Sequence, residues 1–238
     1  LAVGTPSAPD GTIDLQFIED AARDIGQVIR DIKAEKNGVI PSLSERKIIA
    51  IKSTVTPDAF PRISEMLKRE LGLDLGVDYA LASVPEHLQE GIALAGVQRP
   101  DRIVIGVDKR MNEAAIDETV QSLLELFRPR IVLMEQARAR GENVPEPRII
   151  VGSTGSATIE KYLANTYLAS DIVFSDLFAR IAKSLGAAWS EISAMMHRDP
   201  RISPFWFRRP GCGYGGSCFP KDVRAILRFM EQLGLPAT

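Results

Sequence analysis

Hydrophobic and polar residues along the chain follow two patterns, which separate predicted strands from predicted helices. Apolar runs, typical of strands buried on both faces, occur at residues 48–51, 79–82 and 131–134, and a further strand is predicted at residues 102–106. Apolar residues spaced three and four apart, typical of amphipathic helices, occur at residues 12–33, 58–71 and 112–127. Because strands alternate with helices, we predict an α/β fold with a mostly parallel, Rossmann-like sheet.

The ends of these elements indicate where a ligand would bind. Asp14 is the expected N-cap of the first helix. Ligands of such sheets bind beyond the carboxyl ends of the strands, which is where Thr5, Thr54 and Glu86 fall. Turn residues that only cap helices would explain each position about as well. Residues 1–6 predict the end of a buried strand and the loop that follows it. Because no Met precedes them, we expect the chain to be a fragment of a longer protein, with a truncated sheet.

The second half of the chain has a different pattern. Residues 136–148 are polar and predict a surface excursion, whereas residues 156–184 contain neither Gly nor Pro and keep a helical spacing of apolar residues. The latter predict one helix of roughly 40 Å, long enough for a spine between domains or a dimer interface. A further helix is expected at residues 188–197. We therefore predict a partial Rossmann-like domain at residues 1–151 and a helical central domain at residues 152–238.

Composition excludes several classes of function. The 238 residues carry a net charge of −2, so no basic surplus predicts a nucleic-acid partner or an anionic membrane surface. No apolar run is long enough to span a membrane. Two cysteines do not make a disulfide framework and suit a reducing cytoplasm. With two histidines, a zinc site or a His-based triad is not expected, and no metal is predicted.

Residues 210–222 hold four glycines and two prolines, which is incompatible with an ordinary helix or strand. Close approach of bare backbone to a ligand is the expected reason. A helical pattern follows, so Cys218 lies by a helix N-terminus and near Lys221, and both neighbours favour a nucleophilic thiolate. The alternative is a buried structural cysteine in a tight turn. The glycines also fit a dinucleotide-binding fingerprint, but no strand precedes them and no acidic residue follows at the required distance, so we reject it.

A second candidate group lies on the long helix. Lys161 and Asn165 are four residues apart and share a helix face with apolar neighbours. An amine and an amide facing a cleft could hold a sugar hydroxyl and stabilise an oxyanion. A solvated surface pair is the alternative.

Residues 213–222 read Gly-Tyr-Gly-Gly-Ser-Cys-Phe-Pro-Lys-Asp and resemble the active-site signature of the UDP-glucose/GDP-mannose dehydrogenase family. The Lys161-x-x-x-Asn165 helix, the loop at residues 85–91 and the loops at residues 3–6 and 52–55 match in the same order. The resemblance spans the second half of the family's cofactor domain and its helical core, without the glycine-rich cofactor turn or the third, nucleotide-binding domain. Departures occur at residues 56–59, at His87 in place of Phe, and at Thr158 in place of an acid.

The resemblance implies an NAD-dependent, four-electron oxidation of the C6 alcohol of a nucleotide sugar to a carboxylate. Cys218 would form a thiohemiacetal and then a thioester. Lys161 would stabilise oxyanions and Asn165 would place the sugar and a water molecule. Asp222 would orient Lys161 or that water. Glu86, with Thr54, would activate the water.

The resemblance also implies binding residues and partners. The substrate would contact Glu86, His87, Leu88, Lys161, Asn165, Arg201 and Gly215. The cofactor would contact Thr5, Thr54, Glu90 and Lys221. UDP-glucose is favoured by the loop at residues 85–91, GDP-mannose remains open, and a homodimer through the long helix is expected.

Two other functions stay open. A 3-hydroxyacid dehydrogenase shares the Lys-x-x-x-Asn helix but uses no thiol, and Cys218 in its glycine setting argues against it. An inactive fragment or a dimerisation core is the non-enzymatic alternative.

Overall fold

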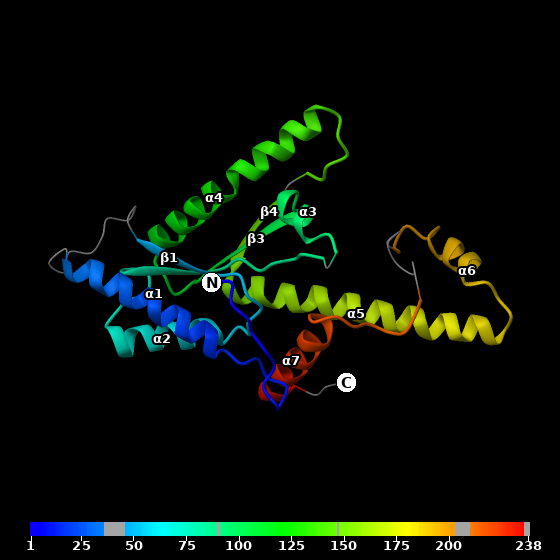
Figure 1. Ribbon diagram of the computed structural model, residues 1–238, viewed down its shortest axis with the longest axis horizontal. Coiled ribbons are helices and arrows are strands. Elements are labelled where there is room, and N and C mark those ends of the chain that lie inside the picture. Colours follow the sequence, from blue (N-terminus) through cyan, green and yellow to red (C-terminus); the bar gives the residue numbers. More distant parts are fainter. Residues whose placement is uncertain (36–45, 90, 147, 203–209, 236–238) are drawn as a thin grey trace. The chain divides into compact units, whose positions relative to one another are not determined.

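The computed structural model describes residues 1–35, 46–89, 91–146, 148–202 and 210–235 (Figure 1). The chain forms two compact units. The first consists of residues 1–8 and 13–161, and the second of residues 9–12 with the described residues from 162 onward. The short segment 9–12 belongs to the second unit, where the Arg228 guanidinium donates a hydrogen bond to the Asp10 carbonyl.

A four-stranded sheet forms the centre of the described part of the first unit. Its strands are β1 (Lys47–Ile51), β2 (Tyr79–Ser83), β3 (Arg102–Val107) and β4 (Arg148–Ser153), in that spatial order. The pairs β1–β2 and β3–β4 are parallel, and β2–β3 is antiparallel. Every residue of β2 is buried, as a continuous apolar run predicts. The predicted α/β class with a mostly parallel, Rossmann-like sheet is therefore confirmed.

Helices cover both faces of this sheet (Figure 1). On one side lie α1 (Gln16–Glu35) and α2 (Ala59–Leu71), and on the other lies α4 (Glu113–Ala139). A short helix, α3 (Ala93–Gln98), precedes β3. The predicted first helix starts four residues late, at Gln16, whose backbone N–H donates to the Asp14 carboxylate over 2.9 Å. Asp14 thus satisfies one of the free N–H groups of the first turn, as expected.

The predicted strand at residues 131–134 is wrong, because these residues belong to α4. The helix continues through Pro129 to Ala139, and Met134 and Ala137 are buried against Val144. A short apolar run cannot by itself be assigned to a strand or a buried helix. The predicted helix 112–127 is therefore too short, and the surface excursion shrinks to the residues between α4 and β4.

Residues 1–6 form no strand, contrary to expectation. They nevertheless run beside the end of β1. The Leu1 carbonyl accepts hydrogen bonds from the backbone N–H groups of Lys52 (2.7 Å) and Ser53 (3.3 Å).

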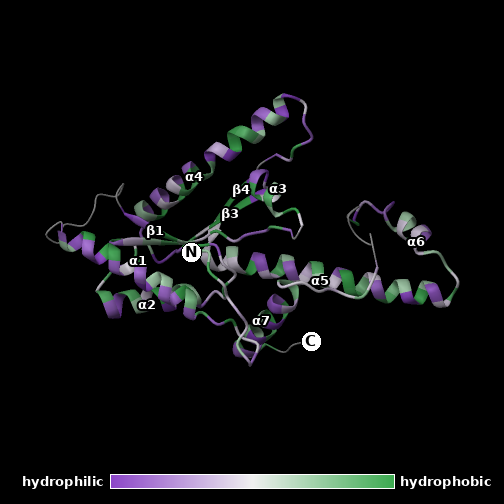
Figure 2. Ribbon diagram, viewed as in Figure 1, coloured by the Kyte–Doolittle hydropathy of each residue, from purple (hydrophilic) through white to green (hydrophobic). Residues whose placement is uncertain are grey.

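The second unit is helical in its described residues. It contains most of α5 (Thr154–Ser184), which begins in the first unit, together with α6 (Trp189–Met196) and α7 (Phe219–Gln232). The long helix predicted at residues 156–184 is confirmed, and its 31 residues correspond to about 46 Å. Hydrophobic positions recur along α5 (Figure 2), and many of them are exposed. None of the helices in the described part of the chain combines the length and apolar character that a membrane span requires.

Candidate active site

The glycine-rich stretch leads directly into the N-terminus of α7. Gly213 and Gly216 have φ of +86° and +77°, a region that residues with a Cβ rarely adopt. At Gly215 an added Cβ would meet nothing within 4 Å among the described residues. The backbone at Gly215 is thus open to a ligand.

Cys218 is the N-cap residue of α7, and Pro220 lies in the first turn, as the sequence predicted. Its thiol is exposed, so the alternative of a buried structural cysteine does not hold. The Ser217 hydroxyl lies 3.6 Å from the Cys218 sulfur. A thiol at this position is accessible to an electrophile and lies beside the positive end of a helix dipole.

Asn165 and Asp222 are brought together from two helices. The Asn165 side-chain amide donates a 2.6 Å hydrogen bond to Asp222 Oδ2, and both residues are buried. The Lys221 amine lies 2.5 Å from Asp222 Oδ1. Asp222 was expected to orient Lys161 or a water molecule, and its carboxylate contacts Asn165 and Lys221. The carboxylate therefore fixes the amide of Asn165 and the first turn of α7.

Lys161 and Asn165 lie four residues apart on α5, and only 8% and 7% of their surfaces are exposed. A solvated surface pair would be far more open, so that alternative is wrong. A buried amine and a buried amide are retained only where polar groups meet them.

The loops that carry Thr5 and Thr54 are neighbours at the carboxyl end of β1. The Ser53 hydroxyl donates to the Val3 carbonyl over 2.6 Å, which joins the two loops, and Thr5 and Thr54 are both half-buried. Parallel sheets bind ligands at this end. The residues after Val55, where the chain departs from the family pattern, lead into α2, with Asp58 as its N-cap residue.

The loop that follows β2 carries Glu86, His87 and Leu88. The Glu86 carboxylate accepts the Leu88 backbone N–H over 2.6 Å, which holds the loop in a tight turn. A cavity of about 550 Å³ within the first unit is lined in part by these three residues and by Lys52. Glu90, which was expected to contact the cofactor, lies outside the described residues.

His87 is held by two residues that the sequence did not single out. Its Nε2 atom lies 2.7 Å from Glu160 Oε2, and Arg102 binds the other oxygen of Glu160 over 3.1 Å. Burial, together with the charges of Arg102 and Lys161, lowers the pKa of His87, although Glu160 acts in the opposite direction. The lowered pKa favours the neutral imidazole, and a neutral ring that donates to the Glu160 carboxylate carries its proton on Nε2. The histidine at position 87, where the family has Phe, was the sequence feature that could have predicted a polar partner for this side chain.

Lys52 lies at the end of β1 and faces the same cavity. Desolvation, with the charges of Arg130 and Lys161, lowers the pKa of Lys52, and Glu86 opposes this shift. Burial is the largest cause of this shift, and an anionic ligand group beside the amine would favour its charged form.

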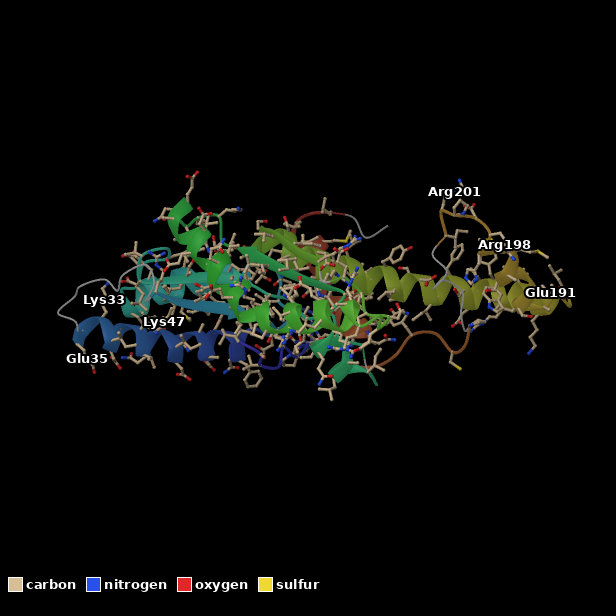
Figure 3. The ribbon with its side chains drawn as sticks, turned by 90° about the horizontal axis from the view of Figure 1, so that it is seen from above. Lys33, Glu35, Lys47, Glu191, Arg198 and Arg201 are labelled. Atoms are coloured by element: carbon tan, nitrogen blue, oxygen red, sulfur yellow. The ribbon has the colours of Figure 1, made fainter. Side chains whose placement is uncertain are left out.

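Arg201 lies in the segment that follows α6 (Figure 3). Its side chain is 87% exposed and pairs with Asp199 over 2.6 Å. The expectation that it reaches the substrate of a partner subunit stays a prediction.

Comparison with known proteins identifies the family. The model of the NAD binding domain of the UDP-glucose/GDP-mannose dehydrogenase family matches residues 1–128, and the model of its central domain matches residues 155–238. The UDP-glucose 6-dehydrogenase of Pseudomonas aeruginosa is 33% identical over 98% of this chain and 44% of its own length. The GDP-mannose 6-dehydrogenase of the same species is 30% identical over 98% of this chain and 46% of its own length.

Solved structures agree with this result. A UDP-glucose dehydrogenase from the archaeon Pyrobaculum islandicum has a TM-score of 0.75 and 36% identity, over 98% of this chain and 46% of that one. The chain therefore spans about half the length of the relatives it matches. NAD is the cofactor of the family domain matched by the first half of the chain. The chain belongs to the UDP-glucose/GDP-mannose dehydrogenase family.

Proposed function

We propose that the full-length protein is a nucleotide-sugar 6-dehydrogenase that oxidises the C6 alcohol of its substrate to a carboxylate, with Cys218 as the nucleophile. The observation that carries the proposal is an exposed thiol at the N-cap of α7, at the end of an open glycine-rich loop, in a helix whose Asp222 is bound to the buried Asn165. Covalent catalysis by a thiol needs this accessibility.

The residues divide the reaction into simple steps. The first oxidation removes a hydride from C6 and a proton from its hydroxyl, which leaves an aldehyde. The Cys218 thiolate then forms a bond to the aldehyde carbon, and Lys161 and Asn165 stabilise the resulting oxyanion. Loss of a second hydride from the protonated thiohemiacetal, with its hydroxyl proton, gives a thioester on Cys218. A water molecule activated by Glu86 with Thr54 attacks the thioester, and the thiolate leaves as the acid forms.

NAD+ supplies the chemistry of hydride acceptance in both oxidations. The adjacent loops that carry Thr5 and Thr54 fit it, because they meet at the carboxyl end of β1, where sheets of this kind bind ligands. We assign Thr5, Thr54, Glu90 and Lys221 to cofactor binding. The match of residues 1–128 to the family's NAD binding domain supports the assignment of Thr5, Thr54 and Glu90, whereas Lys221 lies outside this match.

UDP-glucose is the favoured substrate and GDP-mannose is the second candidate. A UDP-glucose 6-dehydrogenase and a GDP-mannose 6-dehydrogenase match the chain at 33% and 30% identity. These similar values support a nucleotide sugar as the class of substrate and do not single out one sugar. We assign substrate binding to Glu86, His87, Leu88, Lys161, Asn165, Arg201 and Gly215. The loop sequence Pro85-Glu-x-Leu-x-Glu-Gly91 favours UDP-glucose.

We further propose that α5 forms a homodimer interface. In the second unit it exposes large apolar side chains, at Leu163, Tyr167, Leu168, Val173, Phe174, Leu177, Phe178 and Ile181. An apolar surface of this kind marks an interaction site. Within the proposed division of labour, residues 1–151 form the partial cofactor-binding domain, and residues 152–238 serve dimerisation and carry the active-site cysteine.

The test is NADH formation by the natural full-length protein with a panel of nucleotide sugars. We expect activity with UDP-glucose in a ratio of two NADH per sugar consumed, unchanged in the control variant Cys212→Ser. One NADH per molecule with a 3-hydroxyacid would instead identify the single-step dehydrogenase. No NADH with any nucleotide sugar would contradict the proposal and favour a non-enzymatic role.

A further inference from the structure

Asp176 lies in the interior of α5 and is buried, with 6% of its surface exposed. One carboxylate oxygen accepts the backbone N–H of Gly211, and the other accepts that of Gly213 over 2.5 Å. No cation lies within ion-pair distance of Asp176 in the described part of the chain. The glycine-rich stretch thus supplies the two hydrogen bonds that compensate this buried charge.

The stretch is held to α5 at two points. Asn165 and Asp176 are eleven residues apart, and eleven residues turn a helix by about 1100°, only about 20° more than three full turns. The two side chains therefore share one face of α5, about 16 Å apart along its axis. Asp176 holds Gly211 and Gly213, and Asn165 holds Asp222. Cys218 lies between these two attachment points in the sequence.

A carboxylate suits this position better than an amide does. An ionised carboxylate only accepts hydrogen bonds, so both oxygens can face an N–H donor. An amide of the same size would point its own NH₂ group at one of the two glycines. Hydrogen bonds to an ionised acceptor are also stronger than neutral ones. A buried carboxylate without these donors would be costly, which favours the observed loop conformation.

We propose that Asp176 is a positioning residue that fixes the glycine-rich loop on α5 and thereby presents the Cys218 thiol to the aldehyde. Its consequence for catalysis rests on the proposed function, whereas its effect on the loop does not.

The experiment compares Asp176→Asn with Asp171→Asn in the full-length protein. Asp171 makes a matched control, because it lies on the same helix and its Oδ1 atom has no hydrogen-bond partner among the described residues. Hydrogen exchange followed by mass spectrometry measures the protection of the peptide that contains Gly211 and Gly213. We expect exchange of these amides to become about tenfold faster or more in Asp176→Asn, because a hydrogen bond to a charged group is lost, and to stay unchanged in Asp171→Asn. Unchanged exchange in Asp176→Asn overturns the proposal.

The second readout is the NADH yield per nucleotide sugar. The first oxidation does not need the thiol, so Asp176→Asn is expected to lower the yield from two toward one and to release aldehyde, with the KM for NAD+ unchanged. Faster exchange with an NADH yield of two and the kcat of the control would overturn the positioning role. If the wild type makes no NADH, the proposed function fails, while the exchange experiment still decides whether Asp176 holds the loop.

Circular dichroism checks that each variant is folded. If Asp176→Asn does not fold, Asp176→Glu is compared with Asp171→Glu in the same two assays. The longer side chain keeps both acceptor oxygens but moves them by one methylene group, so the same criteria apply.

Discussion

Replacing Asn165 by Ala removes the side-chain amide that donates a 2.6 Å hydrogen bond to Asp222 Oδ2. The Asp222 carboxylate is 1% exposed, so water does not readily replace the lost amide, and Lys221 binds only the other oxygen. A hydrogen bond to a charged group contributes about 1.5–3 kcal/mol, and a buried charged acceptor without its donor costs at least as much. We therefore expect Asn165→Ala to lower the free energy of unfolding by about 2–3 kcal/mol.

An exchange of the two side chains sharpens the prediction. In the double variant Asn165→Asp with Asp222→Asn, donor and acceptor change ends while volume and net charge are kept. We expect the double variant to recover about half or more of the stability that Asn165→Asp alone loses, because the single variant places two carboxylates within hydrogen-bond distance. Activity would not recover, since the amide proposed to hold the sugar is absent from α5.

The assay is equilibrium unfolding in denaturant, read as a shift in the midpoint at constant slope. The control is Asn143→Ala, which changes an exposed asparagine and should stay within about 0.5 kcal/mol of the wild type. A loss below about 0.5 kcal/mol in Asn165→Ala, or an exchange variant no more stable than Asn165→Asp, would refute the argument that this hydrogen bond fixes α7 on α5.

Three further predictions concern pH, packing and assembly. Because the pKa of His87 is lowered from 6.5 in the folded protein, the unfolded chain binds the extra proton first as pH falls. The free energy of unfolding should therefore drop between about pH 7 and 5, and His87→Gln should flatten this slope in denaturation series at each pH. In Gly106→Ala the new Cβ would lie 2.7 Å from the Ala157 Cβ, so thermal melting should show a loss of about 1–3 kcal/mol, whereas Gly155→Ala, with its nearest contact at 3.9 Å, should show much less. Leu163, 65% exposed on α5, is expected at the dimer interface, so Leu163→Glu should shift sedimentation toward the monomer, and an unchanged dimer would exclude this face.

A helix or strand was predictable where the spacing of its apolar residues fits only one of these two structures. The all-buried β2 and the stretch of α5 at residues 156–184, which holds neither Gly nor Pro, each fit a single structure. The apolar run at residues 131–134 fits both a strand and a helix. These residues are helical, and Met134 is buried against Val144. The antiparallel pairing of β2 with β3 depends on how strands meet in three dimensions, which no local pattern encodes.

The candidate site was predictable mainly in its residue types. Cys218 followed from its glycine setting and from the start of α7. Helix spacing put Lys161 and Asn165 on one face, and the family resemblance made them candidates for the site. The partners of these residues did not follow, since hydrogen bonds between residues far apart in sequence arise only on folding. Glu160, which binds His87, and Asp176, which holds the glycine-rich loop, were both missed for this reason.

The most direct test of a cysteine nucleophile is the NADH yield per nucleotide sugar in the full-length Cys218→Ser variant, with hydroxylamine present to trap aldehyde. The wild type should give two NADH per sugar. The variant should give at most one, together with the trapped aldehyde of the first oxidation, because no thioester can form. A variant that still yields two NADH and the carboxylate would contradict the account.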